Sequence, residues 1–247
     1  MNGDFEPARE EIERAREMVH GASRICVLTG AGISQESGVP TFRGAEGLWK
    51  QFRAEELATP EAFYSNPRLV WEWYDWRRQI IAKAKPNAGH YALKEMGDKK
   101  EGFTLITQNV DGLHRKAGSR NLIELHGSIW EIRCTVTGEV EENLDVPLKE
   151  IPPKCSKTGK MARPNVVWFG EIVPHELISR SLRAIEECDL MLIIGTSGLV
   201  QPASYFGIAA KRNNKPVIEI NLEPTPNTGF YDLSIRGKSG NVLPMLL

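Results

Sequence analysis

Two short stretches of this chain combine side chains that could bind and activate a nucleotide. Thr107-Gln108-Asn109-Val110-Asp111 supplies two amides and a carboxylate, and Leu125-His126-Gly127 supplies an imidazole. They follow the apolar runs 103–106 and 122–125. Polar residues directly after buried strands lie where parallel α/β sheets carry their chemistry. The sequence therefore predicts a nucleotide site, with His126 as its candidate general base.

A glycine-rich turn lies upstream of these residues. Gly30-Ala31-Gly32-Ile33-Ser34 follows the apolar run 25–28 and leads into an expected helix start. Glycine allows a diphosphate to approach the backbone, and the N–H groups at a helix start favour negative charge. The dehydrogenase fingerprint has a third glycine where this chain has Gln35, so a plain tight turn remains the alternative. Arg43, in the following loop, is either a phosphate or ribose contact or a solvated arginine.

A predicted helix over residues 67–83 carries a second candidate site. Tyr74 and Arg77 are three residues apart and share one helix face. If that face meets a pocket, a guanidinium and a phenol together would bind a carboxylate. A solvated arginine is the alternative. The tryptophans of this helix are expected to pack in the core.

Apolar runs alternate with helical patterns along the chain, which predicts a doubly wound parallel α/β sheet. The last expected strand, 217–220, ends in Asn221 and Glu223, whose amide and carboxylate suit ribose hydroxyls. A strand-like run is expected within 166–171, and Gly97 is expected to end the helix that starts at residue 86. The other expected strands are 25–28, 103–106, 122–125 and 190–194, and the other helices are 7–19, 112–117, 174–188 and 203–211.

The bulk composition is that of an ordinary soluble protein. The chain has 247 residues, 41% of them apolar and 26% charged, with a net charge of −1. These values indicate no general attraction to nucleic acid or to anionic membranes. No apolar run approaches the roughly 20 residues of a membrane helix, and the charged N-terminus lacks the apolar core of a signal peptide. We therefore expect a cytoplasmic protein, with Cys26 and Cys188 as small buried apolar residues.

The composition changes between residues 134 and 163, where glycine, proline, lysine and glutamate dominate. Cys134-Thr135-Val136-Thr137 and Cys155-Ser156-Lys157-Thr158 look like two Cys-x-x-Cys hooks that have each lost the second cysteine. Two intact hooks would indicate structural zinc, whereas neutral hydroxyls are weak zinc ligands. We expect no tightly bound metal, only the remnant pair Cys134 and Cys155, in an insert held by local packing. Two unrelated cysteines are the alternative.

In chain order, these residues resemble the sirtuins, the NAD-dependent protein lysine deacylases. The resemblance covers roughly residues 24–247, in the family's order and spacing. The motifs that carry it are Gly30-Ala31-Gly32-Ile33-Ser34, Gly38-Val39-Pro40-Thr41-Phe42-Arg43, Thr107-Gln108-Asn109-Val110-Asp111, Leu125-His126-Gly127-Ser128, Val167-Trp168-Phe169-Gly170-Glu171 and Gly195-Thr196-Ser197.

The resemblance implies a Rossmann-like NAD-binding domain of residues 1–43, 86–130 and 164–247. A small domain would comprise residues 44–85 and 131–163. The resemblance also implies that NAD is consumed in the reaction. The acyl oxygen of a modified lysine would attack C1′ of the nicotinamide ribose, nicotinamide would leave, and His126 would then act as base on a ribose hydroxyl.

The resemblance also implies a role for each matched residue. His126 and Asn109 would be catalytic, and the modified lysine would enter as part of an extended peptide strand. The expected NAD contacts are Gly30, Ala31, Gly32, Ser34, Thr41, Phe42, Arg43, Gln108, Asn109, Val110, Asp111, Gly195, Thr196, Ser197, Asn221, Glu223 and Ser239. The expected substrate contacts are Ala58, Tyr74, Arg77, Val167, Trp168, Phe169, Gly170, Glu171, Gly198, Leu199 and Val200.

Tyr74 and Arg77 match the Tyr-x-x-Arg pair of the sirtuins that remove succinyl and malonyl groups, and Ala58 matches the small residue that widens their pocket. The resemblance thus implies desuccinylase and demalonylase activity with some deacetylase activity. Thr137 and Thr158 depart from the family's four cysteines, which puts zinc in doubt. A mono-ADP-ribosyltransferase and a non-catalytic NAD-binding module are the alternative functions.

Overall fold

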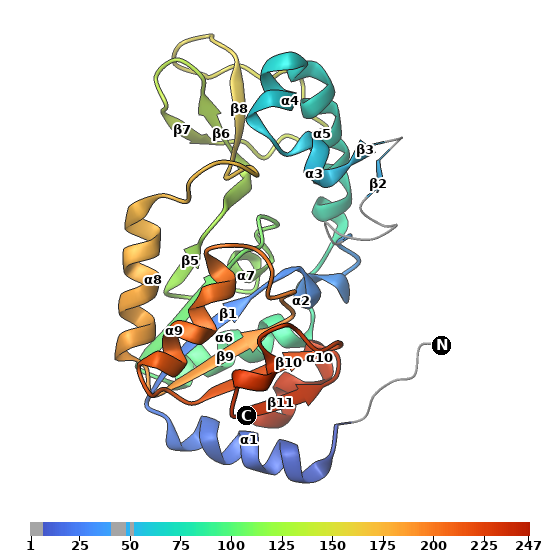
Figure 1. Cartoon of the computed structure of the whole chain (residues 1–247). Helices are drawn as coiled ribbons and strands as arrows, with labels where there is room; N and C mark the ends of the chain where they lie inside the picture. The colour runs from blue at the N-terminus through green and yellow to red at the C-terminus, as the bar shows by residue number, and fades with distance from the viewer. Residues whose placement is uncertain (1–6, 41–47, 50–51) are drawn as a thin grey trace.

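The larger part of the molecule is built around a six-stranded parallel sheet (Figure 1). The computed structural model describes residues 7–40, 48–49 and 52–247, so the predicted NAD contacts Thr41, Phe42 and Arg43 lie outside the described residues. The strand order β11-β10-β9-β1-β4-β5 confirms the predicted doubly wound sheet. Its strands are β1 Arg24–Thr29, β4 Gly102–Thr107, β5 Leu122–Glu124, β9 Leu190–Ile194, β10 Val217–Asn221 and β11 Leu233–Arg236.

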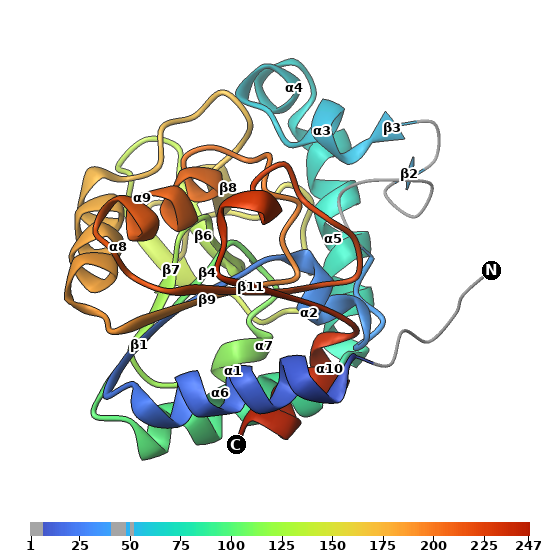
Figure 2. The ribbon, with the colours of Figure 1, turned by 60° about the horizontal axis from the view of Figure 1, so that its bottom comes forward.

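Helices cover both faces of this sheet because its strands are apolar on both sides. In β1, Ile25 and Val27 face one core, and Cys26 and Leu28 face the other. The first face is covered by α1 Arg9–Gly21, α6 Ala88–Lys99 and α10 Ser239–Val242, and the second by α8 His175–Glu187 and α9 Phe206–Arg212 (Figure 2). Cys26 and Cys188 are buried in the second core, as predicted.

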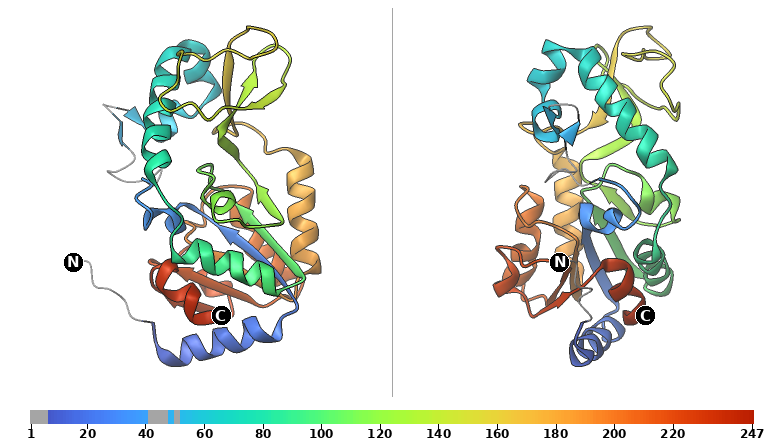
Figure 3. Two further views of the ribbon diagram at one scale, coloured as in Figure 1. Left: turned by 180° about the vertical axis from the view of Figure 1, so that it is seen from behind. Right: turned by 90° about the vertical axis from the view of Figure 1, so that its right-hand side faces the viewer.

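A smaller unit stands beyond the sheet edge at which β5 ends (Figures 1 and 3). Its antiparallel sheet has the order β7-β6-β8, and its core includes the fully buried Phe63, Trp71 and Trp73. The division of the whole chain into two domains at the residue numbers given above remains a prediction. The elements of the smaller unit are β2 Leu48–Trp49, β3 Phe52–Arg53, α3 Ala54–Leu57, α4 Pro60–Ser65, α5 Pro67–Lys83, β6 Gly127–Cys134, β7 Val140–Glu142 and β8 Ala162–Val166.

Three expectations about secondary structure were wrong. Helix α6 continues through Gly97 to Lys99, and a Cβ at Gly97 would lie 2.9 Å from the Phe103 ring, so the glycine serves packing. The sheet has a further edge strand, β11, whose alternating sequence Leu233-Ser234-Ile235-Arg236 contains no continuous apolar run. Strand β8 ends at Val166, so residues 167–171 form a loop. The remaining elements are α2 Ala31–Gln35, α7 Leu113–Lys116, η2 Ala203–Tyr205, η3 Thr228–Phe230 and η4 Leu243–Leu246.

None of the helices within the described residues has both the length and the apolar character needed to cross a membrane. The predicted cytoplasmic location remains a prediction.

Candidate active site

The carboxyl ends of the parallel strands bring the sequence-predicted residues to one edge of the sheet. Thr29 of β1 pairs with Thr107 of β4 and with Ile194 of β9, so the three following turns start side by side. In the sheet, β4 and β5 follow β1 on one side, and the later strands β9, β10 and β11 follow it on the other side. Such a reversal of strand order is where open α/β sheets bind ligands.

The glycine turn after β1 packs against the turn after β9. The Gly30 amide donates to Ile194 O at 3.0 Å, and the Gly32 amide donates to Gly195 O at 2.9 Å. A Cβ on Gly30 would lie 2.8 Å from Gly195 O, and one on Gly32 would lie 2.7 Å from Gly195 Cα. The contact between these two turns therefore requires both glycines, and the approach of a diphosphate to this turn remains a prediction.

Ser34, Asn109 and Asp111 form a buried polar cluster beside the glycine turn. The Asn109 side-chain amide donates to Gly30 O at 3.0 Å and to Ser34 Oγ at 3.1 Å. Its Oδ1 is therefore the group left to accept a hydrogen bond from a ligand hydroxyl or carboxamide. Burial raises the pKa of Asp111, while hydrogen bonds from the Leu113 amide and Ser34 and the charge of Arg77 act in the opposite direction.

A buried chain of polar groups beneath this cluster was not recognised in the sequence. Thr29 Oγ1 donates to Thr107 Oγ1 at 2.8 Å and lies 2.9 Å from His114 Nε2. Thr107 Oγ1 also accepts the Asn109 amide at 3.1 Å. The ring of His114 lies 4.8 Å from that of His90. Thr107, itself bonded to Thr29, holds the backbone of Asn109 in place. Each threonine is the last residue of its strand, and this shared position is the sequence signal that could have revealed the pair.

His90 gives a prediction for stability in acid. Burial lowers its pKa to about 4, from an ordinary value of 6.5. The unfolded chain therefore takes up a proton below pH 6.5 that the folded chain refuses until about pH 4, so the folded state loses stability as pH falls through this range. We expect a loss on the order of 2 kcal/mol between pH 7 and pH 5 from His90 alone. Urea unfolding of the wild type and His90→Gln at both pH values measures it. Equal slopes with pH would contradict the assignment.

His126 lies at the junction between the parallel sheet and the small antiparallel sheet, separated from β5 by Leu125 and directly before β6. Its Nδ1 lies 3.1 Å from Gln108 O. A carbonyl only accepts, so Nδ1 carries the proton and Nε2 remains free to take one from a substrate. The next residue must be glycine, because Gly127 has φ +78° and a Cβ there would lie 2.1 Å from Asn165 O. This close approach of β8 fixes the backbone at His126.

The surroundings of His126 predict how kcat/KM falls at acidic pH. Burial lowers the pKa of His126, and the hydrogen bond to Gln108 O opposes that shift only in part. A general base with a lowered pKa stays neutral at more acidic pH. We expect kcat/KM for an acyl-lysine peptide to fall on the acid side with an apparent pKa below 6.5. Rates from pH 5 to pH 8, with tryptophan fluorescence as a check on folding, measure it. A limb at or above pH 6.5 would contradict this environment.

Three consecutive residues after β8 each contact a different predicted site residue. The Val167 amide donates to His126 O at 2.9 Å. Trp168 Nε1 donates to the Tyr74 hydroxyl at 2.9 Å, and the Phe169 amide donates to Ala58 O at 2.9 Å. The loop thus joins the candidate base to Tyr74 of α5 and to Ala58, directly after α3.

Tyr74 and Arg77 both lie within the protein, at 2% and 4% exposure. Burial raises the pKa of Tyr74, and it lowers the pKa of Arg77, where the nearby Tyr74 and Asp111 act in the opposite direction. The Arg77 guanidinium also lies 5.5 Å from the centre of the Trp73 ring. The shared face of Tyr74 and Arg77 therefore points inward, between Trp168 and Asp111, and the alternative of a solvated arginine is wrong.

A partly buried ion pair braces the loop that carries Trp168. Arg163 binds both carboxylate oxygens of Glu171, at 2.6 and 2.8 Å, and its guanidinium lies 3.5 Å from the centre of the Trp168 ring. Glu171 also accepts the Trp168 amide at 2.8 Å. This arrangement gives Glu171 a bracing role, in addition to the predicted substrate contact. Gly170, at φ +85°, and the partly exposed Gly198, Leu199 and Val200 complete the predicted substrate segments.

The residues predicted for the adenosine side lie near the ends of β9 and β10 and at the start of α10. The Asn221 amide donates to Thr196 O at 2.7 Å, which joins the two strand ends, while Ser197 and Glu223 are exposed. Ser239 donates to Glu36 at 3.0 Å. Sequence reasoning missed Glu219, a fully buried carboxylate that accepts bonds from three hydroxyls and so holds the loop after β10. The donors are Thr225, Thr228 and Ser234.

The two remnant hooks come together in the small sheet. Cys134 Sγ lies 3.4 Å from Thr158 Oγ1 and within hydrogen-bonding reach of Thr137 and of the Cys155 thiol. The alternative of two unrelated cysteines is therefore wrong. Within the described part of the chain, no three His, Cys, Asp or Glu side chains are grouped to hold a metal. Two thiols with two neutral hydroxyls do not fit tetrahedral zinc, so the absence of tightly bound zinc remains our prediction.

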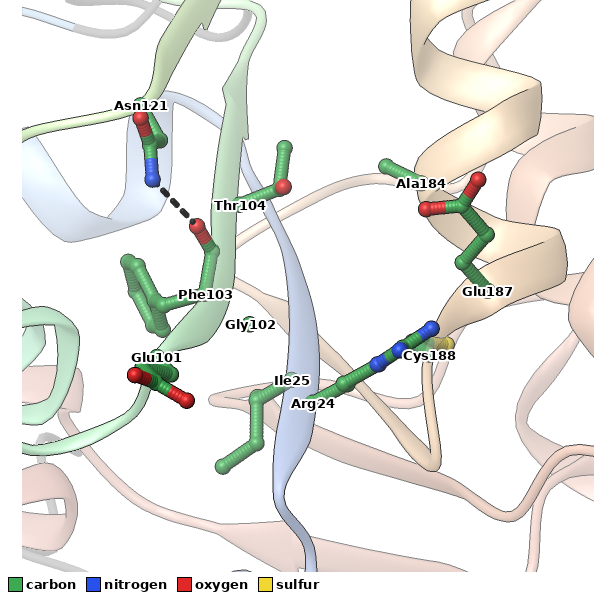
Figure 4. A pocket seen from close by; sticks show the side chains of 10 residues that line it. All are labelled: Arg24, Ile25, Glu101, Gly102, Phe103, Thr104, Asn121, Ala184, Glu187 and Cys188. Carbon is green, nitrogen blue, oxygen red and sulfur yellow. Dashed lines mark hydrogen bonds between the residues drawn. The ribbon is translucent and has the colours of Figure 1, made fainter.

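A surface hollow lies at the opposite edge of the parallel sheet (Figure 4). Arg24 and Gly102, at the starts of β1 and β4, line it together with Glu101 and Glu187. Its charges are mixed, and it lies at the amino ends of the strands, away from His126. It therefore forms no part of the candidate site.

Comparison with known proteins agrees with this fold and site. Residues 30–202 match the model of the Sir2 family. Over 219 residues the chain is 54% identical to an NAD-dependent protein deacylase of Aquifex aeolicus, covering 89% of this chain and 92% of that protein. Over 241 residues it is 50% identical to one of Pyrococcus abyssi, covering 96% of each.

Solved structures show the same relationship. A Sir2 homologue in complex with 2′-O-acetyl ADP-ribose superimposes with a TM-score of 0.90 and 44% identity, covering 95% of this chain and 94% of that one. A Sir2 complex with a p53 peptide and NAD⁺ has a TM-score of 0.84 and 28% identity, over 94% and 95% of the two chains. The chain belongs to the Sir2 family of NAD-dependent protein deacylases. This membership confirms the predicted enzyme class and NAD as the co-substrate.

Proposed function

We propose that this enzyme removes succinyl and malonyl groups, and also acetyl groups, from protein lysines. It consumes NAD and releases nicotinamide and acyl-ADP-ribose. The loop of Val167, Trp168 and Phe169 carries the proposal, because it joins His126, Tyr74 and Ala58 in one site. The base, the predicted carboxylate-binding pair and the predicted wide pocket therefore serve the same acyl group.

In this mechanism the acyl oxygen of the modified lysine attacks C1′ of the nicotinamide ribose, and the C1′–nitrogen bond to nicotinamide breaks. Asn109 Oδ1 accepts a hydrogen bond from the ribose or carboxamide, since its N–H groups already donate within the protein. Nε2 of His126 then removes the proton of a ribose hydroxyl. The resulting oxygen attacks the acyl carbon, so the acyl group passes to ADP-ribose and the lysine amine is freed.

Trp168 prepares Tyr74 to bind an acidic acyl group. The indole N–H can only donate, so the Tyr74 hydroxyl accepts at 2.9 Å and its own proton must point elsewhere. A carboxylate beside Arg77 would receive that proton together with the guanidinium charge. The distal carboxylate of a succinyl or malonyl group supplies such an acceptor, and an acetyl group does not.

Trp168→Phe tests this orientation, because phenylalanine keeps an aromatic ring in the site but has no N–H. A neutral hydrogen bond contributes about 0.5–1.5 kcal/mol. We expect the ratio of succinyl to acetyl kcat/KM to fall by up to about tenfold. Paired assays with the two peptides measure the ratio, and thermal unfolding checks the fold. An unchanged ratio would show that the indole does not orient Tyr74.

We propose that the peptide carrying the lysine lies as an extended strand between residues 169–171 and 198–200. Within the first segment the amides of Phe169 and Glu171 already donate, to Ala58 O and Trp168 O. The strand would therefore use the carbonyl groups of this segment and the Gly170 amide. Backbone pairing of this kind makes flanking-residue preference mild.

The experiment that tests the proposed function is nicotinamide release from NAD with matched succinyl-lysine and acetyl-lysine peptides. Faster release with the succinyl peptide supports an acidic-acyl deacylase. Release with the acetyl peptide alone would reduce the proposal to a deacetylase. Labelled ADP-ribose appearing on protein would favour the transferase alternative, and no release with either peptide would favour the NAD-binding module.

A further inference from the structure

The two Cys-x-x-Thr-Gly turns of the small sheet have the same backbone construction. In the first, the Cys134 amide donates to Glu139 O at 2.8 Å, and the Gly138 amide donates to Cys134 O at 3.0 Å. In the second, the Cys155 amide donates to Lys160 O at 2.8 Å, and the Gly159 amide donates to Cys155 O at 2.9 Å. Both turns thus hold a cysteine rigidly at the equivalent position.

The turns face each other, so their thiols meet. Cys134 Sγ lies 3.4 Å from Thr158 Oγ1 of the second turn, and the thiols of Cys134 and Cys155, at 2% and 5% exposure, are close enough to interact. The first ends β6 and pairs with Ala162 of β8, whereas the second lies in the segment that returns to β8 through the bridge between Lys154 and Met161. The segment between Cys134 and Cys155 therefore forms a closed loop, whose two ends are already held together by the contacts between the two turns.

We propose that Cys134 and Cys155 form a reversible disulfide, with a low-molecular-weight disulfide such as oxidised glutathione as the oxidant. A covalent link would then close the insert where the hydroxyls of Thr137 and Thr158 cannot complete a zinc site.

The bond forms by two exchange steps. The Cys134 thiolate attacks one sulfur of the oxidant, whose S–S bond breaks and releases a small thiol. The Cys155 sulfur then attacks the Cys134 sulfur, the mixed S–S bond breaks, and a second small thiol leaves. Two protein thiols are oxidised and one small disulfide is reduced to two thiols, so atoms and electrons balance.

The surroundings favour Cys134 as the attacking group. Hydrogen bonds from Thr137 and Thr158 lower its pKa to about 6, whereas burial and Cys134 itself raise the pKa of Cys155 to about 11. A thiolate is the nucleophile in exchange. Cys134 itself is 2% exposed, but residues 135–139 of the first turn are all exposed, so a small opening of this turn admits the oxidant.

The test is to equilibrate the full chain in glutathione buffers, block free thiols with N-ethylmaleimide under denaturing conditions, and map the peptides. We expect a linked peptide containing Cys134 and Cys155, the loss of two blocked thiols per chain, and reversal by dithiothreitol. Closing a loop of this size is expected to raise Tm by about 5–10 °C. Cys134→Ser and Cys155→Ser should abolish both the linked peptide and the rise in Tm.

The second pair of neighbouring cysteines, Cys26 and Cys188, supplies the matched control. These lie in the core of the parallel sheet, and the double variant Cys26→Ala, Cys188→Ala should keep the Cys134–Cys155 link. Four blocked thiols after oxidation, a link between Cys26 and Cys188, or a link between two chains would overturn the proposal. One tightly held zinc per chain that protects Cys134 and Cys155 would also overturn it. None of these readouts depends on which acyl group the enzyme removes.

Discussion

Replacing His126 by alanine is expected to lower the rate of lysine deacylation by about 10²–10⁴-fold, the usual contribution of a general base. The imidazole is held by Gln108 O with Nε2 free to accept a proton. The measurement is free-lysine peptide formed from a succinyl-lysine peptide and NAD, followed by mass spectrometry.

The same His126→Ala variant should retain exchange of labelled nicotinamide into NAD. In the proposed sequence, nicotinamide leaves before His126 acts, so the first step does not require the imidazole. His126→Gln is a matched variant with similar bulk and no basic nitrogen, and it should behave alike. Loss of exchange and deacylation to the same extent would place His126 in binding or in the first step.

Replacing Arg77 by methionine is expected to lower kcat/KM for the succinyl-lysine peptide by about ten- to hundredfold and to leave the acetyl-lysine peptide nearly unaffected. A charge-assisted hydrogen bond is worth about 1.5–3 kcal/mol, which corresponds to that range. Methionine keeps most of the volume in this buried position without the charge. The two peptides are compared with one enzyme stock at saturating NAD.

The acetyl-lysine peptide is the control for a second role of Arg77. Because the guanidinium also acts on the buried Asp111, its loss could disturb the NAD side of the site. In that case both peptides would lose rate equally. Tyr74→Phe, which keeps the ring and removes the hydroxyl, should lower only the succinyl rate, by a smaller factor. Equal losses for both peptides would contradict the acyl-recognition role of Arg77.

The sequence predicted the sheet and the positions of the candidate catalytic residues because both depend on local patterns. Short apolar runs ending in polar residues marked β4 and β5, and the helix over 67–83 was predicted with the bounds of α5. The inward orientation of the face that carries Tyr74 and Arg77 could not be predicted, because it depends on the bond from Trp168 to Tyr74 and on the charge of Asp111 near Arg77, both far away in the chain.

Other features required knowledge of the neighbouring strands. Gly30 and Gly32 were singled out for an approaching diphosphate, but the close approach that the structure shows comes from Gly195, more than 160 residues later. In the sequence Glu219 looks like an ordinary strand residue, because two of its hydroxyl donors come from the loop after β10 and the third from β11. Pairings of this kind leave no periodic signal in the sequence.

The most direct test of the whole account is a product balance for a succinyl-lysine peptide incubated with NAD and the wild-type enzyme. The account predicts one nicotinamide and one succinyl-ADP-ribose for each free lysine formed, because the acyl group passes to the ribose. Free lysine appearing together with succinate while NAD remains intact would contradict it, since that result is simple hydrolysis.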